Sequence, residues 1–284
     1  MVHPFPPGIS FVKLEATGND FVVVDEPAAA PSSPVEVRRR LCHRHTGVGA
    51  DGVLTILCRE GRYRMHITNP DGSVPEMCGN GLRCVARHLA ETGRIATAVP
   101  VLIDTDAGPR SVVVEPGLDA VTIDMGAADF ACLRQFPRAL SRSPLHGYAH
   151  ATSVSMGNPH VVIEVDALPS AEEATRMGRA IELDSITFPE RTNVEWAVVG
   201  TDGCVDVLVW ERGAGLTQAC GTGACAVVAA LVLHGVVPPG PTTLRLPGGL
   251  LRITLSDLTK PILMSGPVRR VFAGVAAIGA DPKP

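Results

Sequence analysis

The fold is decided by a stretch that occurs twice: Thr17-Gly18-Asn19-Asp20-Phe21-Val22-Val23-Val24-Asp25 and, 139 residues later, Met156-Gly157-Asn158-Pro159-His160-Val161-Val162-Ile163-Glu164. A second pair has almost the same offset, 142 residues: Cys78-Gly79-Asn80-Gly81 and Cys220-Gly221-Thr222-Gly223. Nine residues before each cysteine stands a polar residue, Asn69 or Glu211. A period of half the chain is too long for a solenoid. It predicts two homologous domains related by a pseudo-twofold axis.

Local patterns predict how each half folds. Phe21–Val24 and Val161–Val165 are short β-branched runs after a Gly-Asn turn, which indicates strands. A helix begins at each Cys-Gly-x-Gly motif, and the helix at Thr222–His234 is apolar on every side, so other structure must enclose it. Further strands are expected at Ser111–Glu115, Val121–Asp124, Val194–Val199, Val205–Trp210 and Leu250–Leu255.

The predicted fold class is therefore α/β, with two domains that each consist of a curved, mostly antiparallel sheet wrapped around a central helix. The expected first domain spans residues 1–117, and the segment 267–284 returns to it. The expected second domain spans residues 118–266.

Composition excludes several classes of function. The net charge is −4, and the chain has 2 Trp, 2 Tyr and 7 Phe, which leaves few side chains on which bases could stack and argues against nucleic-acid binding. Met1–Ser10 lacks the basic and apolar regions of a signal peptide. The apolar run Ala224–Leu233 is much shorter than the roughly 20 residues of a membrane span. We expect a cytoplasmic protein with no membrane or nucleic-acid partner.

The cysteines do not form a recognisable metal or disulfide pattern. The chain has 8 cysteines but no Cys-x-x-Cys pair, so no metal site is predicted. A chain of this length and apolar content does not need disulfides for its stability. Outside the two motifs, the cysteines are expected to be core thiols: Cys42, Cys58, Cys84, Cys132, Cys204 and Cys225.

Cys78 and Cys220 have a different setting, because each begins a helix. The unpaired N–H groups and the dipole of a helix start attract anions and favour a thiolate, so we expect lowered thiol pKa values and a cradle for a carboxylate. Inverting an α-carbon needs a base on one face and an acid on the other, and two such thiols supply both. The alternative is that both are ordinary buried thiols, and the repeated context argues against it.

The chain resembles the diaminopimelate epimerase family at six stretches that lie in the same order. They are Gly18-Asn19-Asp20-Phe21, Gly47–Gly52, Asn69-Pro70-Asp71-Gly72-Ser73 leading to Cys78-Gly79-Asn80-Gly81, Met156–His160, Phe188–Val194, and Glu211–Gly215 leading to Thr217–Cys225. The resemblance implies cofactor-independent epimerisation of LL-diaminopimelate to meso-diaminopimelate, a step that supplies lysine and peptidoglycan precursors, by a homodimer.

The resemblance also implies the roles of individual residues. Cys78 and Cys220 match the acid/base pair, and His160 and Glu211 match positions that tune the thiol pKa values. The residues that match substrate contacts are Asn19, Asn69, Gly79, Asn80, Asn158, Asn193, Glu211, Arg212, Gly221 and Thr222.

Some residues have a simpler interpretation. Asn19 and Asn158 could merely shape turns, His160 could be a strand histidine with satisfied hydrogen bonds, and Glu211-Arg212 could be a solvated ion pair. We expect Arg83, Arg87 and His88 to lie on an exposed helix face.

The sequence departs from the family pattern at Gly52, at Leu216 and at Glu15-Ala16-Thr17, so a related racemase or epimerase of another amino acid stays open as an alternative. A cysteine nucleophile that forms a thioester, with Cys78 beside His160, and a non-catalytic metal- or partner-binding module are the competing classes.

Overall fold

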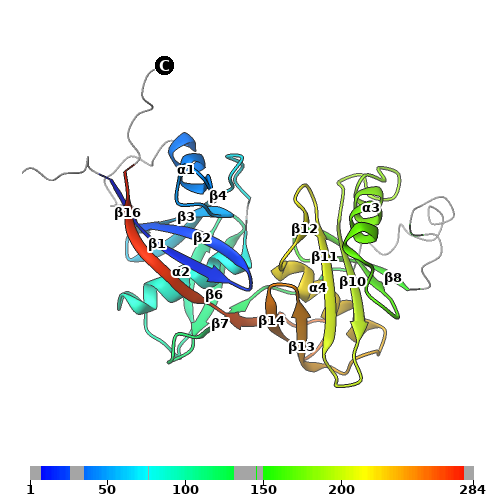
Figure 1. Cartoon of the computed structure of the whole chain (residues 1–284). Coiled ribbons are helices and arrows are strands. Elements are labelled where there is room, and N and C mark those ends of the chain that lie inside the picture. The colour runs from blue at the N-terminus through cyan, green and yellow to red at the C-terminus, as the bar shows by residue number, and fades with distance from the viewer. Residues whose placement is uncertain (1–7, 26–34, 76, 131–144, 146–149, 278–284) are drawn as a thin grey trace, which may run out of the picture. The chain divides into compact units, whose positions relative to one another are not determined.

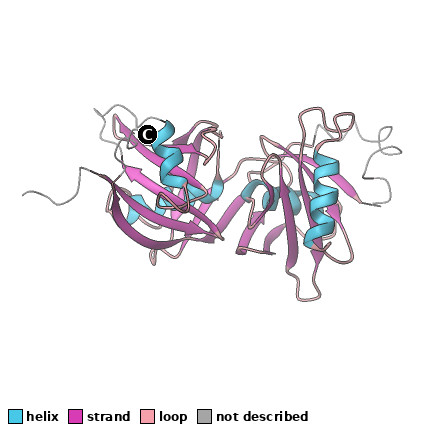
Figure 2. Ribbon diagram, turned by 45° about the horizontal axis from the view of Figure 1, so that its top comes forward, coloured by secondary structure: helices cyan, strands magenta, loops and turns pink. Residues whose placement is uncertain are grey.

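The computed structural model describes residues 8–25, 35–75, 77–130, 145 and 150–277. It divides the chain into two compact units: the first comprises the residues up to Ile123 and those from Pro267 onward, and the second comprises Asp124–Gly266. Strands make up most of each unit, and helices pack against them (Figure 2).

The first unit is a sheet with two helices. Its strand order is β16 (Arg269–Ala276), β1 (Ile9–Ala16), β2 (Asn19–Asp25), β3 (Gly52–Arg59), β4 (Arg62–Thr68), β5 (Val101–Thr105), β6 (Gly108–Val114) and β7 (Ala120–Asp124). Helix α1 (Val35–Cys42) follows β2, and helix α2 (Gly79–Glu91) follows β4 (Figure 1). The apolar face of α2, with Leu82, Val85 and Leu89, has no exposed surface. Helix α2 packs against strands from near both ends of this sheet, including β1 and β6. It therefore forms the core of the unit.

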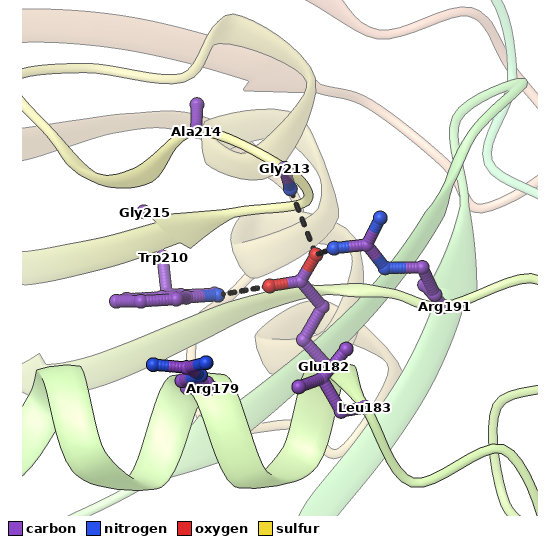
Figure 3. Close-up of a pocket in the computed structure, with 8 residues that line it drawn as sticks. All are labelled: Arg179, Glu182, Leu183, Arg191, Trp210, Gly213, Ala214 and Gly215. Carbon is purple, nitrogen blue, oxygen red and sulfur yellow. Dashed lines mark hydrogen bonds and ion pairs between the residues drawn. The ribbon is translucent and has the colours of Figure 1, made fainter.

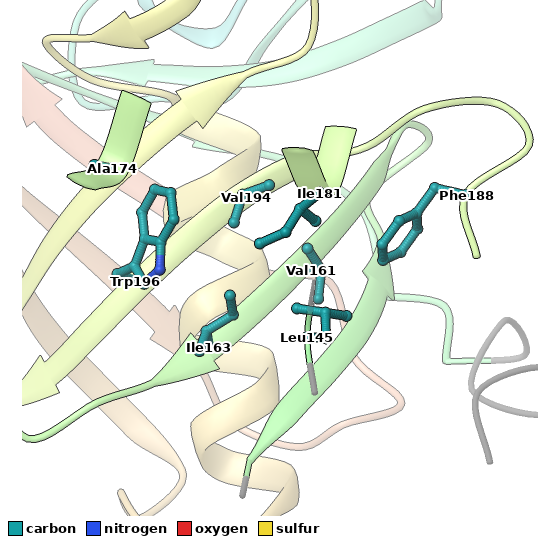
Figure 4. Packing of buried hydrophobic residues seen from close by; sticks show 8 residues of the cluster. All are labelled: Leu145, Val161, Ile163, Ala174, Ile181, Phe188, Val194 and Trp196. Atoms are coloured by element: carbon teal, nitrogen blue, oxygen red, sulfur yellow. The ribbon is translucent and has the colours of Figure 1, made fainter. Parts of the chain in front are cut away.

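The second unit has the same plan. Its strand order is β8 (Ala151–Ser155), β9 (Pro159–Glu164), β10 (Asn193–Val199), β11 (Val205–Glu211), β13 (Gly240–Leu246), β14 (Gly249–Leu255) and β15 (Leu263–Pro267), and the short strand β12 (Gly215–Thr217) pairs with β11. Helix α3 (Ala171–Glu182) follows β9, and α4 (Gly221–Leu233) follows β12. Almost all of α4 is buried. Helix α3 covers a cluster centred on Trp196, Ile163 and Val161 (Figure 4).

The internal repeat of the sequence is a repeat of strand pairing. From β1 to β7 the successive pairs are antiparallel, parallel, antiparallel, parallel, antiparallel and antiparallel. The pairs from β8 to β15, without β12, follow the identical series. The predicted α/β class and mostly antiparallel sheets around central helices are confirmed.

One expectation about α2 is wrong, because its polar face is not exposed. Arg83 is fully buried and donates to the hydroxyl of Thr17 at 2.7 Å. The buried ring of His88 lies 3.0 Å from Asp25 Oδ2, and Arg87 donates to the carbonyls of Leu118 and Val268. The sheet surrounds α2 so fully that its charged side chains find partners inside the unit.

Within the described part of the chain, no helix has both the length and the apolar content that crossing a membrane requires. The long apolar stretch of the second half is instead the buried helix α4.

Candidate active site

Two cysteines stand at equivalent helix starts. Cys78 is the N-cap of α2 and Cys220 is the N-cap of α4, both in extended backbone conformation. The Sγ of Cys78 accepts the N–H of Gly81 at 3.4 Å, and the Sγ of Cys220 accepts the N–H of Gly223, also at 3.4 Å. The sequence motif therefore produces one local structure twice, in which a sulfur atom satisfies an otherwise unpaired helix N–H.

The third residue after each cysteine is a glycine because a strand side chain occupies the space beside it. A Cβ at Gly81 would lie 2.9 Å from Leu54 Cδ2, and a Cβ at Gly223 would lie 2.6 Å from Glu195 Oε1. Leu54 belongs to β3 and Glu195 to β10, which are corresponding strands of the two units. Each central helix thus begins in direct contact with the same strand of its sheet.

The environment of Cys220 corrects the expectation of a lowered thiol pKa. Cys220 is 6% exposed, and burial raises its pKa well above the ordinary value, with the carboxylates of Glu211 and Glu195 adding to the rise. Hydrogen bonds from the Thr222 hydroxyl and the Gly223 N–H lower the pKa of Cys220, but by less than burial and the carboxylates raise it. The loss of solvation raises the pKa of Cys220 more than the helix start lowers it, so Cys220 is a protonated thiol at neutral pH.

Glu211 lies beside this thiol. It is the last residue of β11, and its Oε1 accepts the Thr217 hydroxyl at 2.5 Å. Burial raises the pKa of Glu211, although hydrogen bonds with Thr217 and Cys220 lower it in part. A carboxyl group with a raised pKa in contact with a thiol can exchange a proton with it.

His160 is fully buried and joins a chain of polar contacts that ends at Cys220. Its Nε2 lies 3.0 Å from Asn158 Oδ1, and Asn158 Nδ2 donates to Thr222 Oγ1 at 3.4 Å. The Thr222 hydroxyl lies 3.4 Å from Cys220 Sγ. On the other side of the ring, Nδ1 lies 2.7 Å from Glu195 Oε1. The interpretation of Asn158 as only a turn residue is too narrow, because its side chain links the ring to the helix start.

Asn193 and Arg212 are also in contact. Asn193 Oδ1 accepts the backbone N–H of Arg212 at 2.9 Å, and its Nδ2 donates to the Pro159 carbonyl at 2.8 Å. The Arg212 guanidinium donates to the carbonyl of Glu190 at 2.8 Å, so Glu211 and Arg212 do not form the solvated ion pair that was the simpler interpretation.

Glu182 holds the turn that follows Arg212 (Figure 3). This buried carboxylate accepts the N–H of Gly213 at 2.8 Å and the indole N–H of Trp210 at 2.7 Å, and it pairs with Arg191. These groups line a surface pocket in the second unit. Sequence reasoning missed Glu182, since a glutamate at the end of a helix gives no signal of such a role.

In the first unit, Asn19 and Asn80 lie together. Asn19 Nδ2 donates to Asp51 Oδ2 at 2.7 Å, and Asn80 Nδ2 donates to Asn19 Oδ1 at 3.4 Å. Asn80 is buried in the first turn of α2, next to Cys78 and Gly79. The side chain of Asn69 instead donates to Ser73 Oγ at 3.0 Å within its own turn after β4.

Asp51 belongs to a charged group that supports Asn19. Arg44 bridges Asp20 and Asp51 at 3.0 Å and 2.8 Å, and Lys13 pairs with Asp20 at 2.5 Å. Burial alone would raise the pKa of Asp20, but hydrogen bonds from Arg44 and Lys13 lower it to about 2. Asp20 is therefore ionised at neutral pH, and the hydrogen bond from Asn19 Nδ2 to Asp51 holds the Asn19 amide in a defined orientation.

Apart from Asn69, the expected site residues thus form one group in each unit. Around α2 lie Cys78, Gly79, Asn80 and Asn19, with Asn69 in a separate turn; around α4 lie Cys220, Gly221, Thr222, Asn158, His160, Asn193, Glu211 and Arg212. Among the described residues, no group of three or more His, Cys, Asp or Glu side chains is arranged to hold a metal ion.

A repeated sheet around a buried helix is a fold that solved structures share. A probable proline racemase from Agrobacterium radiobacter K84 superposes with a TM-score of 0.67 and 17% identity, over 96% of this chain and 94% of that one. A predicted epimerase from Pseudomonas aeruginosa has a TM-score of 0.66 and 19% identity, over 94% of this chain and 98% of the other. These likenesses define the class of fold.

Sequence comparison identifies the family within that class. The diaminopimelate epimerase family model matches residues 11–131 and 152–271. The diaminopimelate epimerase of Moorella thermoacetica is 42% identical over 277 residues, which cover 93% of this chain and 98% of that protein. That of Desulfitobacterium hafniense is 40% identical over 283 residues, with 94% and 98% covered. The chain belongs to the diaminopimelate epimerase family.

Proposed function

We propose that this protein epimerises LL-diaminopimelate to meso-diaminopimelate without a cofactor, and that Cys78 and Cys220 are its acid/base pair. The observation that carries the proposal is the repeated helix start, where each sulfur accepts the N–H of a glycine three residues later. Membership of the family supports the choice of substrate. The two halves, residues 1–117 with 267–284 and residues 118–266, would each provide one thiol.

The proposed reaction is a pair of proton transfers at one α-carbon. A thiolate removes the α-proton from one face, and the other thiol gives its proton to the opposite face, so the carbon is inverted and the two sulfurs exchange roles. The backbone N–H groups at Gly79-Asn80 and Gly221-Thr222 would bind the α-carboxylate and stabilise the charge that develops on it.

The residues around α4 are suited to prepare Cys220 for this role. Because burial and the nearby carboxylates raise its pKa, Cys220 is a proton donor in the present structure, and Glu211 is in contact to share that proton. We propose that His160 and Glu211 together set the protonation of Cys220.

The far end of the substrate would be held by polar groups from both units. Asn19, Asn69, Asn158 and Asn193 offer amide donors and acceptors, Glu211 complements an ammonium, and Arg212 can bind a carboxylate with two hydrogen bonds. In the present structure the Arg212 guanidinium binds the Glu190 carbonyl, so substrate would exchange that contact for its own carboxylate.

We further propose a cytoplasmic homodimer that binds neither nucleic acid nor membrane. The edge strand β16 supports an interface between two copies, because it carries exposed apolar side chains: Val271 is 56% exposed, Phe272 47% and Val275 66%. An exposed apolar edge strand is a surface that proteins usually cover.

The proposal is tested by incubating the reduced protein, without added cofactor or metal, with LL-diaminopimelate and separating the stereoisomers by chiral chromatography. We expect meso-diaminopimelate to form until both isomers are present at equilibrium. A panel of proline, hydroxyproline, lysine and histidine tests the alternative that the protein is a racemase or epimerase of another amino acid. Conversion of one of these with diaminopimelate left unchanged would replace the proposed substrate, and conversion of none would refute the activity.

A further inference from the structure

Glu195 is a buried carboxylate that the sequence did not single out. It lies on β10 with no exposed surface, and its Oε1 is 2.7 Å from His160 Nδ1. Its second oxygen, Oε2, has no hydrogen-bond partner among the described residues. A buried carboxylate with so few partners is stable only if the imidazole donates to it.

Glu195 lies beside the start of α4 as well as beside His160. Its Oε1 would lie 2.6 Å from a Cβ at Gly223, so the carboxylate packs against the first turn of α4. A helix start favours a negative charge in that place. The carboxyl group is therefore held between the imidazole of His160 and the start of α4.

The other ring nitrogen of His160 also faces an acceptor. Nε2 lies 3.0 Å from Asn158 Oδ1, while the amide nitrogen of Asn158 donates to Thr222. An imidazole with acceptors at both nitrogens is satisfied only when both carry hydrogen. The geometry thus places both ring nitrogens of His160 against oxygen atoms, one of Glu195 and one of Asn158.

In the first unit, the positions that correspond to His160 and Glu195 are occupied by the apolar residues Phe21 and Leu54. In the second unit His160 pairs with Asn193, and Glu195 follows two residues later; in the first, Phe21 pairs with Gly52, and Leu54 follows two residues later. Leu54 packs against Gly81 as Glu195 packs against Gly223. The fold accommodates an apolar pair here, so the buried His160 and Glu195 have a role beyond folding.

We propose that Glu195 is a positioning residue that keeps His160 as an imidazolium and thereby fixes the Asn158 amide, with its N–H directed to Thr222 beside Cys220. In the first unit, Asp51 orients the corresponding Asn19 instead. The inference rests on the proposed function only in the assumption that Asn158 and Cys220 act on the substrate.

The direct test is nitrogen-15 NMR of the full-length protein with labelled histidine, where the His160 signals are assigned by their loss in His160→Phe. At pH 7.5 we expect both ring nitrogens of His160 to be protonated in the wild type and only one in Glu195→Gln. Glu172→Gln, an exposed change on α3 of the same unit, is the matched control and should give the wild-type spectrum. A neutral His160 ring in the wild type would overturn the proposal.

Thermal unfolding provides a second test, because the first unit supplies a replacement pair. His160→Phe and Glu195→Leu each leave one buried polar partner alone, whereas the double variant recreates the Phe21 and Leu54 arrangement. We expect the double variant to unfold at a higher temperature than Glu195→Leu alone. Simply additive losses would contradict a coupled ion pair.

Kinetics separate this inference from the proposed function. Glu195→Gln should lower kcat/KM for LL-diaminopimelate by about 10- to 100-fold, as expected for a residue that orients a functional group, with most of the loss in kcat. Wild-type kinetics in this variant would refute the positioning role. A wild-type protein inactive on diaminopimelate would refute the proposed function, and the NMR and unfolding results would still decide the state of His160.

Discussion

The sulfur of Cys220 lies 3.4 Å from the backbone nitrogen of Gly223 and accepts its hydrogen bond. Cys78 has the same relationship with Gly81 in the other unit. The two sulfurs thus share a backbone environment, but the strand side chain beside the bonded glycine differs: Leu54 lies beside Gly81, and Glu195 lies beside Gly223. The proposed chemistry depends on the shared part.

Replacing either cysteine should abolish overall epimerisation. Cys78→Ala and Cys220→Ala each remove one of the two proton-transfer groups, and we expect losses of at least about 100-fold in kcat. The measurement is the initial rate of conversion of LL-diaminopimelate.

Cys58→Ala is the matched control for these variants, because Cys58 is partly exposed near the end of β3 in the first unit. It should retain wild-type activity. A Cys220→Ala protein that folds and turns over normally would exclude Cys220 from the reaction.

Gly223→Ala should damage the second unit more than Gly81→Ala damages the first. The new methyl group would lie 2.6 Å from Glu195 Oε1, which is held by His160, whereas at Gly81 it meets a terminal methyl of Leu54 at 2.9 Å. We expect Gly223→Ala to lower the free energy of unfolding by about 1–3 kcal/mol. Denaturant titration measures this, and equal effects of the two substitutions would contradict the fixed position of Glu195.

Glu182→Gln should weaken substrate binding more than turnover. The Glu182 carboxylate holds Gly213 and Trp210, and a neutral amide would loosen the turn that follows Arg212. We expect KM for LL-diaminopimelate to rise several-fold while kcat changes less. Steady-state kinetics measure both, with Glu172→Gln as an exposed control on the same helix; an unchanged KM would show that this turn does not contribute to binding.

Acid should destabilise the first unit in a defined pH range. The pKa of Asp20 is lowered from 3.8 to about 2 in the folded state by hydrogen bonds from Arg44 and Lys13, which outweigh its burial. A depressed folded-state pKa gives stability that is present above about pH 4 and is lost as the pH falls towards 2, about 2 kcal/mol in total. Asp20→Asn should make the free energy of unfolding less dependent on pH in this range.

The control for the acid experiment is Asp166→Asn, at an exposed position. It should leave the slope of stability against pH between 4 and 2 unchanged. If Asp20→Asn has the same slope as the wild type, the ion pairs of Asp20 with Lys13 and Arg44 do not contribute to stability.

The sequence predicted the elements that local patterns determine. The Cys-Gly-x-Gly repeat predicted both buried helices, and the β-branched runs predicted strands such as β9 and β10. The burial of Arg83 and His88 was missed, because a helical pattern does not show that a sheet encloses the polar side of a helix as well.

Long-range pairing explains the other omissions. Glu195 is a single charge in the apolar strand Asn193–Val199, and only the pairing of β9 with β10 places it against His160. The helix start at Cys220 predicted a lowered pKa, but burial and two carboxylates, which come from β10 and β11, reverse its direction. Such effects depend on contacts between residues far apart in the sequence.

The claim that two thiols act on one α-carbon is tested most directly by deuterium labelling at low conversion. The reduced protein is incubated with LL-diaminopimelate in D2O, and substrate and product are separated and analysed by mass spectrometry. With two bases, the new proton comes from a thiol that has exchanged with solvent, so the meso product should carry one deuterium while the remaining LL-diaminopimelate is unlabelled. Deuterium appearing in the recovered LL-diaminopimelate as fast as in the product would show a single base and contradict the account.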